Sequence, residues 1–510
     1  MHAPEKTQPT ASTASHKLTR RGYTVKKAAL TADDIAQVRA DLFVIPVNPV
    51  RDKMLAERKR WDPDAPDPSD DGFKVYKENA AKLYLPPFYG VHRFGVPAVN
   101  ELKARGAPID LLFHGSLREA QQDVAEQTVA HLDAHGGGLL QLRCGFGKTI
   151  IALYLFARLK VKVLVLVHKE FLMNQWRERI AQFLPDARVG TLQAKVCDVE
   201  DRDIVIGMLQ SVAVGKYPAS TYDAFGMCCF DECHHLGAAV FSKAMDIGRT
   251  RYMLGLSATP DRKDGLRKVF DWQLGEVICK VEAKVTQHVY VEVEPFKDPD
   301  VTVTPEKMVV LRIDGRPTLY EEKPSFRAKL LTYLLESVPR MDHLTQVVLK
   351  YAADPLRRVL VLSERRKHLE TIGKRLTAVG VEHGYYWGGA KQAQLEEAAT
   401  KQVLLGTYHM ASEGMDVPEL NTVVLASPKS DIKQSVGRIL RKTDHPVLPT
   451  VVDLVDASLP CFARQLHIRK RFYKASGFSY SKEARAEVVE EEKVAEVDKV
   501  GKGVFLFRGV

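Results

Sequence analysis

Short apolar runs alternate with amphipathic stretches along this chain from about residue 116 onward. The runs are rich in Val and Leu and have the length of strands, which is typical of buried parallel strands with helices between them. They lie at residues 138–142, 161–167, 203–207, 225–230 and 251–256, and again at 359–362, 402–406, 422–426 and 450–455. Between residues 366 and 379 the apolar positions fall three or four apart, which predicts a helix. The pattern therefore predicts an α/β fold with two tandem, doubly wound parallel-sheet lobes.

A chain of 510 residues is too long for one core, and changes in the pattern suggest where its domains end. We expect a small N-terminal accessory domain over 22–115, a first lobe over 116–280 and a second lobe over 326–478. The stretch 281–325 lacks the alternation and contains several prolines, so we expect the inter-lobe connection there. Residues 1–21 are predicted to be a disordered tail, with a mitochondrial transit peptide as the alternative. Residues 479–510 are predicted to be a C-terminal tail, with a partner-docking peptide as the alternative.

The composition narrows the class of protein. Lys and Arg number 74 against 64 Asp and Glu, so the net charge of +10 favours an anionic partner such as nucleic acid. No run approaches the ~18 uncharged apolar residues of a membrane helix, so no membrane partner is expected. The seven cysteines show no regular spacing, which argues against a secreted, disulfide-stapled protein and favours a soluble intracellular one.

A glycine-rich segment, residues 142–149, follows the first apolar run and precedes a helical stretch. It reads Leu-Arg-Cys-Gly-Phe-Gly-Lys-Thr, and in such a turn the backbone N–H groups converge on phosphate oxygens at a helix N-terminus. Lys148 would neutralise the β- and γ-phosphates of ATP, and the Thr149 hydroxyl would bind Mg²⁺. The usual pattern begins with Gly or Ala, where this chain has Leu142. The segment is a predicted ATP site.

Two carboxylates, Asp231 and Glu232, follow the apolar run 225–230. Carboxylates at the carboxyl end of a parallel strand lie on the ligand side of the sheet. We therefore expect Asp231 to hold Mg²⁺ and Glu232 to activate the attacking water. Cysteines and histidines crowd around this point, which suggests zinc as the alternative. Because adjacent strand residues face opposite sides and no second ligand pair has zinc spacing, we expect the cysteines Cys228, Cys229 and Cys233 to be core residues.

Two later segments carry polar residues suited to coupling and catalysis. Ser257-Ala-Thr259-Pro follows another apolar run, and its hydroxyls are candidates to link the phosphate state to lobe movement; an ordinary turn is the alternative. Gln434-Ser-Val-Gly-Arg438-Ile-Leu-Arg441 places two arginines three residues apart, on one face of a helix. Guanidinium groups from a facing lobe can neutralise transition-state charge on the γ-phosphate, whereas a solvated basic helix is the alternative.

Together these segments resemble, in order, the motif set of the superfamily-2 helicases, which implies RecA-like lobes and further site residues. Leu117-Arg-x-x-Gln121 resembles the adenine-reading element. The implied nucleotide-binding residues are Gln121, Cys144, Gly145, Phe146, Gly147, Lys148, Thr149 and Asp416, and the implied catalytic residues are Lys148, Asp231, Glu232, Gln434, Arg438 and Arg441. Segments 167–169, 175–176, 210–211, 362–365 and 406–416 resemble elements that contact nucleic acid. The implied contact or coupling residues are His168, Lys169, Gln210, Ser211, Ser257, Thr259, Ser363, Arg365, Gly406 and Thr407.

A narrower resemblance is visible in segments 84–95, 168–176 and 256–265. They resemble the poxvirus transcript-release helicase and its relatives in large cytoplasmic DNA viruses. Residues 434–441, Gln175-Trp176 and Leu142 resemble the wider xeroderma pigmentosum group B-like branch. The narrower resemblance implies a DNA-dependent ATPase of 3′ to 5′ polarity that acts with viral transcription machinery, in the host cytoplasm or the virion. His168-Lys169 replaces the Pro-Thr common elsewhere in the superfamily. The resemblance therefore does not say which backbone groups of the nucleic acid this loop contacts. The alternatives are an RNA motor, a nucleic-acid scaffold with an inactive nucleotide site, and the motor subunit of a nuclease.

Overall fold

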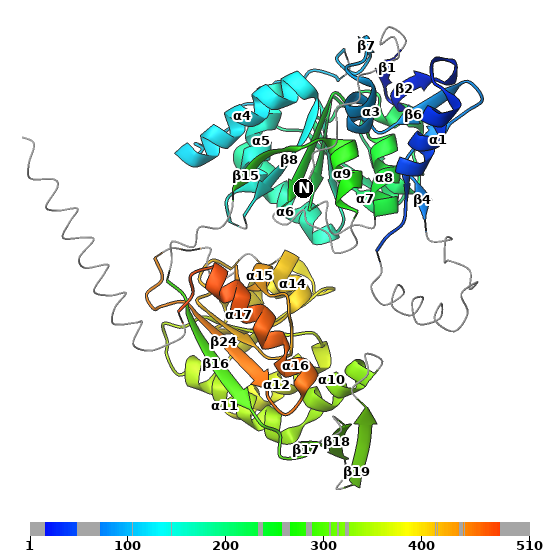
Figure 1. The fold of residues 1–510 in the computed structure, drawn as a ribbon. Helices are drawn as coiled ribbons and strands as arrows, with labels where there is room; N and C mark the ends of the chain where they lie inside the picture. Colours follow the sequence, from blue (N-terminus) through cyan, green and yellow to red (C-terminus); the bar gives the residue numbers. More distant parts are fainter. Residues whose placement is uncertain are drawn as a thin grey trace, which may run out of the picture. The chain divides into compact units, whose positions relative to one another are not determined.

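In the computed structural model the chain forms two compact units, residues 1–282 and 283–510. Figure 1 shows the helices and strands of each unit, coloured along the sequence from blue at the N-terminus to red at the C-terminus. The residues that the structure describes are 16–47, 72–104, 106–143, 145–232, 238–257, 266–281, 288–304, 308–313, 316–321, 326–413, 415, 417–437, 442 and 444–479.

An eight-stranded sheet forms the centre of the first unit, in the order β11-β10-β12-β9-β13-β14-β8-β15. Neighbouring strands are parallel except β10 and β11. The bounds are β8 (Gly137–Leu142), β9 (Val163–Val167), β10 (Val189–Gln193), β11 (Val196–Asp198), β12 (Ile204–Met208), β13 (Met227–Asp231), β14 (Tyr252–Ser257) and β15 (Val277–Val281). Every apolar run predicted in the first lobe is a strand of this sheet, so that prediction is confirmed.

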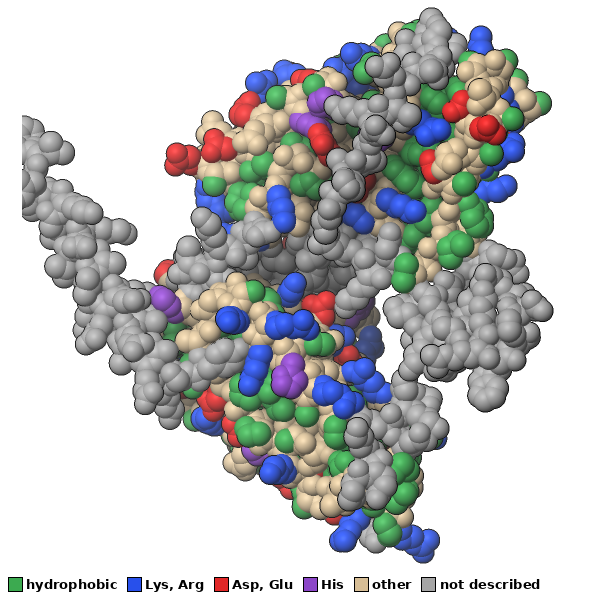
Figure 2. Space-filling view, viewed as in Figure 1, with side chains coloured by type: hydrophobic (Ala, Val, Ile, Leu, Met, Phe, Trp, Pro, Cys, Tyr) green, Lys and Arg blue, Asp and Glu red, His purple; other side chains and the backbone are tan. Residues whose placement is uncertain are grey.

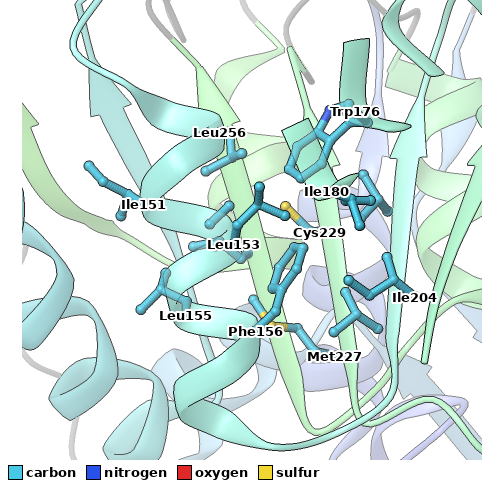
Figure 3. Packing of buried hydrophobic residues seen from close by; sticks show 14 of the residues in the cluster. Ile151, Leu153, Leu155, Phe156, Trp176, Ile180, Ile204, Met227, Cys229 and Leu256 are labelled. Atoms are coloured by element: carbon cyan, nitrogen blue, oxygen red, sulfur yellow. The ribbon is translucent and has the colours of Figure 1, made fainter. Parts of the chain in front are cut away.

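Helices cover both faces of this sheet. One face packs against α4 (Glu119–His135), α5 (Lys148–Leu159) and α6 (Glu170–Phe183), and Figure 3 shows part of that cluster. The other face packs against α7 (Leu209–Ala213), α8 (Ala238–Ile247) and α9 (Arg267–Leu274). Along β13, Cys229 belongs to the first cluster and Cys228 to the second, and both are fully buried. The prediction that these cysteines are core residues on opposite faces is confirmed.

The N-terminal part of the first unit forms a smaller sheet in the order β5-β6-β2-β1-β7. Its elements are β1 (Lys17–Thr19), β2 (Gly22–Lys26), α1 (Ala32–Asp41), β5 (Lys77–Glu78), β6 (Lys82–Leu85), α3 (Pro87–Phe94) and β7 (Val99–Asn100), with β3 (Phe43–Val44) and β4 (Phe73–Lys74) paired beside it. The core of this smaller sheet packs against α9, one of the helices on the large sheet. There the ring centroids of Tyr89 and Trp272 are 5.5 Å apart. Because β1 pairs with β2, the prediction of a disordered tail is wrong for residues 16–21.

The second unit contains a six-stranded, fully parallel sheet in the order β16-β24-β23-β20-β22-β21. The strands are β16 (Tyr290–Phe296), β20 (Val359–Ser363), β21 (His383–Tyr386), β22 (Val403–Thr407), β23 (Thr422–Leu425) and β24 (Thr450–Asp456). The four runs predicted in this lobe are among them, which confirms that prediction too. Strand β16 lies within the expected inter-lobe connection, so that expectation is wrong for this stretch. After β16, the strands β17 (Val301–Val303), β18 (Met308–Ile313) and β19 (Arg316–Glu321) form a small antiparallel sheet.

The second unit's helices are α10 (Arg327–Glu336), α11 (Val338–Ala352), α12 (Arg366–Ala378), α13 (Gln392–Thr400), α14 (Tyr408–Glu413), α15 (Lys433–Val436), α16 (Pro460–Ala463) and α17 (Gln465–Ala475). Helices α11 and α12 pack their apolar residues against one face of the parallel sheet. Helix α12 confirms the predicted helix almost to its ends. The spacing of apolar residues was sufficient to find it because that stripe is the part that enters the core.

Two buried ion pairs fasten helices of the second unit to β24. Arg340 of α11 donates from Nε to Asp456 at 2.5 Å and from a terminal nitrogen to the Ala426 carbonyl at 2.9 Å. Arg469 of α17 donates from Nε to Asp453 at 2.8 Å. Both arginines and both aspartates have side chains at most 4% exposed. Each charge is therefore paired and hydrogen-bonded out of contact with water, which is the condition under which buried ions are tolerated.

Candidate nucleotide and nucleic-acid sites

The glycine-rich segment connects β8 to α5 in the first unit. Gly145 and Gly147 have φ angles of 75° and 97°, in the left-handed region that side chains disfavour. Gly147 is the N-cap of α5, so the helix starts at Lys148, and its first turn has no acidic residue. A helix N-terminus with free N–H groups and no nearby carboxylate of its own attracts phosphate. The geometry agrees with the predicted phosphate loop; Cys144 lies outside the described residues.

Two side chains at the start of α4 hold this loop through the Phe146 carbonyl. Gln121 donates to it from Nε2 at 2.6 Å, and Arg118 donates to it from a terminal nitrogen at 2.8 Å. Gln121 also accepts from the Arg118 backbone N–H at 3.0 Å. A side chain at position 147 would bring its Cβ within 2.4 Å of the Gln121 nitrogen, so glycine is required there for this contact. The predicted adenine-reading glutamine is thus part of one assembly with the phosphate loop.

Asp231 and Glu232 lie at the carboxyl end of β13, between the neighbouring strands β9 and β14. Glu232 Oε1 lies 2.5 Å from Lys148 Nζ, and the two side chains are 18% and 13% exposed. Glu232 has a φ of 47°, which is uncommon for a residue with a side chain and is found most often at functional sites. Lys148 and Glu232 are 84 positions apart in the sequence, and the fold of the sheet brings their side chains into contact.

Asp231 accepts a hydrogen bond from the indole N–H of Trp176, with 2.9 Å between Nε1 and Oδ2. Burial, followed by the negative charge of Glu232, raises the pKa of Asp231 above its usual value. The resemblance had placed Gln175-Trp176 in an element that contacts nucleic acid. That expectation is wrong for Trp176, because its side chain is 1% exposed and faces the sheet.

The predicted contact residues of the first unit lie near the carboxyl ends of β9, β12 and β14. Gln210 donates from Nε2 to the His168 carbonyl at 2.9 Å, so the loops after β9 and β12 are joined. Burial, followed by the charge of Lys169, lowers the pKa of His168, and burial lowers the pKa of Lys169 to about 8. Ser211 accepts from the Ala194 N–H at 3.0 Å, and Ser257 is fully buried at the end of β14. Thr259 lies outside the described residues.

In the second unit, Ser363 is the last residue of β20 and Arg365 lies two residues after it, and Gly406 and Thr407 end β22, its neighbour. The buried Ser363 hydroxyl lies 2.9 Å from Nδ1 of His368. Arg365 donates to Thr332 of α10 at 2.7 Å. Gln434 lies on α15; Asp416, Arg438 and Arg441 lie outside the described residues. Within the first unit, the structure therefore joins Lys148 to Glu232 and Gln121 to the loop that precedes Lys148 and Thr149, with Asp231 next to Glu232 at the end of β13.

Two residues of the site were not assigned from the sequence. From the sequence, we placed Trp176 in an element that contacts nucleic acid. We included Arg118 in the Leu117–Gln121 motif without giving its side chain a role. The available signals were weak: a tryptophan on the apolar face of a helix that follows a central strand, and an arginine three residues before the glutamine. Neither signal identifies the atom that the side chain contacts.

The donor atoms fit ATP and Mg²⁺. A hydroxyl at Thr149 and a carboxylate at Asp231 are the hard oxygen ligands that Mg²⁺ prefers, alongside phosphate oxygens. Within the described part of the chain, no group of three or more His, Cys, Asp and Glu residues is arranged to hold a metal. Cys233, His234 and His235, which suggested the zinc alternative, are outside that part. Among the described helices, none has the length and apolar character needed to cross a membrane.

The chain is similar in sequence to known proteins. Residues 114–262 match the family model described as "Type III restriction enzyme, res subunit". "Putative ATP-dependent RNA helicase L396" of Acanthamoeba polyphaga mimivirus is 32% identical over 478 residues, which cover 92% of this chain and 88% of the mimivirus protein. The chain belongs to the superfamily-2 helicases.

This helicase also resembles "Putative ATP-dependent RNA helicase QP509L" of African swine fever virus (strain Badajoz 1971 Vero-adapted), at 27% identity over 68% of this chain and 70% of the viral protein. Among solved structures, T4 UvsW aligns with 88% of this chain and 95% of its own, at 19% identity and a TM-score of 0.35, which is too low to assign a fold. As a superfamily-2 helicase, the protein is an ATP-dependent enzyme of the kind found in large DNA viruses, and each of its two units contains a parallel sheet with helices packed on it. The predicted fold class is confirmed.

Proposed function

We propose that this helicase hydrolyses ATP to move along DNA in the 3′ to 5′ direction and that it acts in viral transcription, at transcript release. The ion pair between Lys148 and Glu232, next to Asp231 and at the start of α5, is the observation that carries the proposal. It assembles a phosphate-binding cation, a metal-binding carboxylate and a general base from two segments that are 84 residues apart. An inactive scaffold would have no physical need for this arrangement.

Each residue has a distinct role in this proposal. Lys148 binds the β- and γ-phosphates, and binding exchanges its carboxylate partner for phosphate oxygens. Glu232, released by that exchange, accepts the proton of the attacking water. Thr149 and Asp231 would hold Mg²⁺, which neutralises phosphate charge when bound. Gln121 reads the adenine, and its bond to the Phe146 carbonyl joins base recognition to the phosphate loop.

The second lobe supplies the remaining groups in the proposal. Arg438 and Arg441 neutralise transition-state charge on the γ-phosphate, with Gln434 and Asp416 beside them. Ser257 and Thr259 couple the phosphate state to lobe movement. Contacts to the strand backbone come from His168, Lys169, Gln210 and Ser211 in the first lobe and from Ser363, Arg365, Gly406 and Thr407 in the second. Such contacts to phosphates are tolerant of sequence and sensitive to salt.

The surface of the second unit supports an anionic partner. Figure 2 shows Lys and Arg side chains on the visible face of this unit, in the region where Figure 1 draws α17. Lys470, Arg471 and Lys474 of α17 and its N-cap Arg464 are exposed, and α17 itself contains no acidic residue. A helix that exposes several cations and contains no acidic residue is suited to a phosphate backbone.

RNA is the second candidate substrate. The mimivirus and African swine fever virus relatives are both named RNA helicases, whereas the narrower sequence resemblance implies DNA. Backbone contacts do not separate the two, because the distinguishing group is the 2′-hydroxyl. Transcription machinery as a partner, and the host cytoplasm or virion as the location, belong to the same proposal and rest on the viral relatives.

The test is ATP turnover of the purified chain with single-stranded DNA, duplex DNA, RNA or no nucleic acid, followed by unwinding of partial duplexes with a 3′ or a 5′ overhang. Stimulation by DNA and unwinding from the 3′ overhang support the proposal. Stimulation by RNA alone would replace DNA with RNA as the substrate. Turnover that no nucleic acid changes would overturn the motor assignment. The Lys148→Ala protein provides the background rate.

A further inference from the structure

The indole of Trp176 joins helix α6 to the carboxylate at the end of β13. Its N–H donates to Asp231 Oδ2 at 2.9 Å, and no described residue donates to the other oxygen, Oδ1. The relative exposure of Trp176 is 1% and that of Asp231 is 9%, so little water competes for this bond. A hydrogen bond to an ionised carboxylate at a protected site is among the stronger ones in proteins.

The ring of Trp176 is itself held by packing. It stacks on Phe156 of α5, with centroids 6.0 Å apart and ring planes 18° apart, inside the cluster that covers one face of the sheet. Figure 3 shows the indole at one end of this cluster, near Cys229 and Ile180, with its nitrogen turned away from the ring of Phe156. The donor therefore has a fixed position, whereas an aspartate without a partner rotates broadly about its last side-chain bond.

We propose that Trp176 is a positioning residue for the metal ligand: its N–H fixes the plane of the Asp231 carboxylate so that Oδ1 faces the ion. The inference deepens the proposed function and rests on Asp231 binding Mg²⁺. Groups that orient a metal ligand in this way commonly change metal affinity by about 10–100-fold when they are removed.

A purely structural tryptophan would behave differently. If Trp176 only fills space, replacing it loosens the apolar cluster and lowers the stability of the empty protein, with no selective effect on Mg²⁺. If it orients Asp231, the nucleotide affinity measured without metal stays the same and the metal requirement rises. The two roles are thus separated by measuring nucleotide binding with and without Mg²⁺.

The experiment compares Trp176→Phe, which keeps an aromatic ring, with Ile180→Val, which loosens the same cluster one helical turn away and leaves the indole intact. Binding of a fluorescent ADP is titrated with Mg²⁺ and repeated in EDTA. We expect Trp176→Phe to need about 10–100-fold more Mg²⁺ for half-maximal binding, with unchanged affinity in EDTA. Ile180→Val should match the wild type in both. An unchanged Mg²⁺ requirement in Trp176→Phe overturns the inference.

Two additions make the result decisive. The tryptophan analogue 3-benzothienylalanine, in which sulfur replaces the N–H, keeps the ring shape at position 176 and decides the question if the Phe variant does not fold. In an Asp231→Ala background, Trp176→Phe should have no further effect on the Mg²⁺ requirement; an additive effect would show that Trp176 acts elsewhere. Wild-type protein that binds ADP independently of Mg²⁺ and does not hydrolyse ATP would overturn the proposed function itself, which is a separate outcome.

Discussion

Lys148 Nζ and Glu232 Oε1 lie 2.5 Å apart, so the cation proposed to bind phosphate is paired with the carboxylate proposed to activate water. The pair is mostly buried, which makes both charges costly to leave alone. If the proposed roles hold, we expect ATP phosphate to replace Glu232 as the partner of Lys148 and to leave Glu232 to the attacking water.

Replacing the cation should separate catalysis from strand binding. In Lys148→Ala, we expect ATP turnover to fall by about a thousandfold or more, because the phosphates lose their clamp. Binding of a labelled oligonucleotide should survive, since the proposed strand contacts lie in other loops. Lys160→Ala is the matched control, because Lys160 ends the same helix and pairs with exposed Asp110. Turnover within about tenfold of wild type would remove Lys148 from the phosphate site.

Glu232→Gln should stop the chemical step and preserve binding. An amide keeps the size of the side chain but does not accept the water's proton, so hydrolysis should slow by about 10²–10⁴-fold. Asp231 is untouched, so ATP should accumulate on the protein, which single-turnover assays and the stoichiometry of retained ATP would reveal. Glu178→Gln, on the exposed side of α6, is the control. Normal hydrolysis in the variant would mean that another group positions the water.

Gln121→Ala should alter the selection of the nucleotide base. The change removes the bond to the Phe146 carbonyl and one to the Arg118 N–H, so both the base contact and the support of the phosphate loop are weakened. We expect KM for ATP to rise by about tenfold and the preference for ATP over GTP to shrink. Steady-state kinetics with both nucleotides measure this. Gln122→Ala, on the exposed side of the same helix, should leave both values unchanged.

Nucleic-acid affinity should fall as the pH rises through the pKa of Lys169. Burial lowers this pKa to about 8, so the ammonium is present below that pH and is lost above it. If Lys169 contacts a backbone phosphate, affinity should weaken by up to about tenfold between about pH 7 and 9. Fluorescence anisotropy with one oligonucleotide across this range tests it. Lys169→Arg stays charged throughout and should flatten the profile; an equally steep profile in that variant would exclude Lys169 as the source.

The sequence was sufficient to predict nine of the fourteen strands that the structure describes in the two large sheets, because buried parallel strands are apolar throughout; β10, β11, β15, β16 and β21 were not predicted. It failed at β16 for a physical reason. This strand reads Tyr-Val-Glu-Val-Glu-Pro-Phe and lies at the sheet's edge, where charges and Pro295 are tolerated. The charged residues and the proline of this strand interrupt the apolar pattern, which is why we expected an inter-lobe connection there.

The site itself was predicted as separate segments rather than as contacts. Asp231 and Glu232 were identified because they follow a strand, but the bond from Trp176 joins residues 55 positions apart. It depends on how α6 lies on the sheet and on the rotamer of one indole. The short strand β1 was missed because three residues, Lys-Leu-Thr, carry almost no pattern of their own.

The ion pairs of Arg340 with Asp456 and of Arg469 with Asp453 have a practical consequence at the bench. Dissolved salt screens charges that are in contact with water, and these four side chains have almost no such contact. Contacts with a phosphate backbone weaken steeply as salt is added. A concentrated salt wash should therefore strip co-purifying nucleic acid from the second lobe while that lobe stays folded, so the protein can be cleared of nucleic acid before any activity is measured.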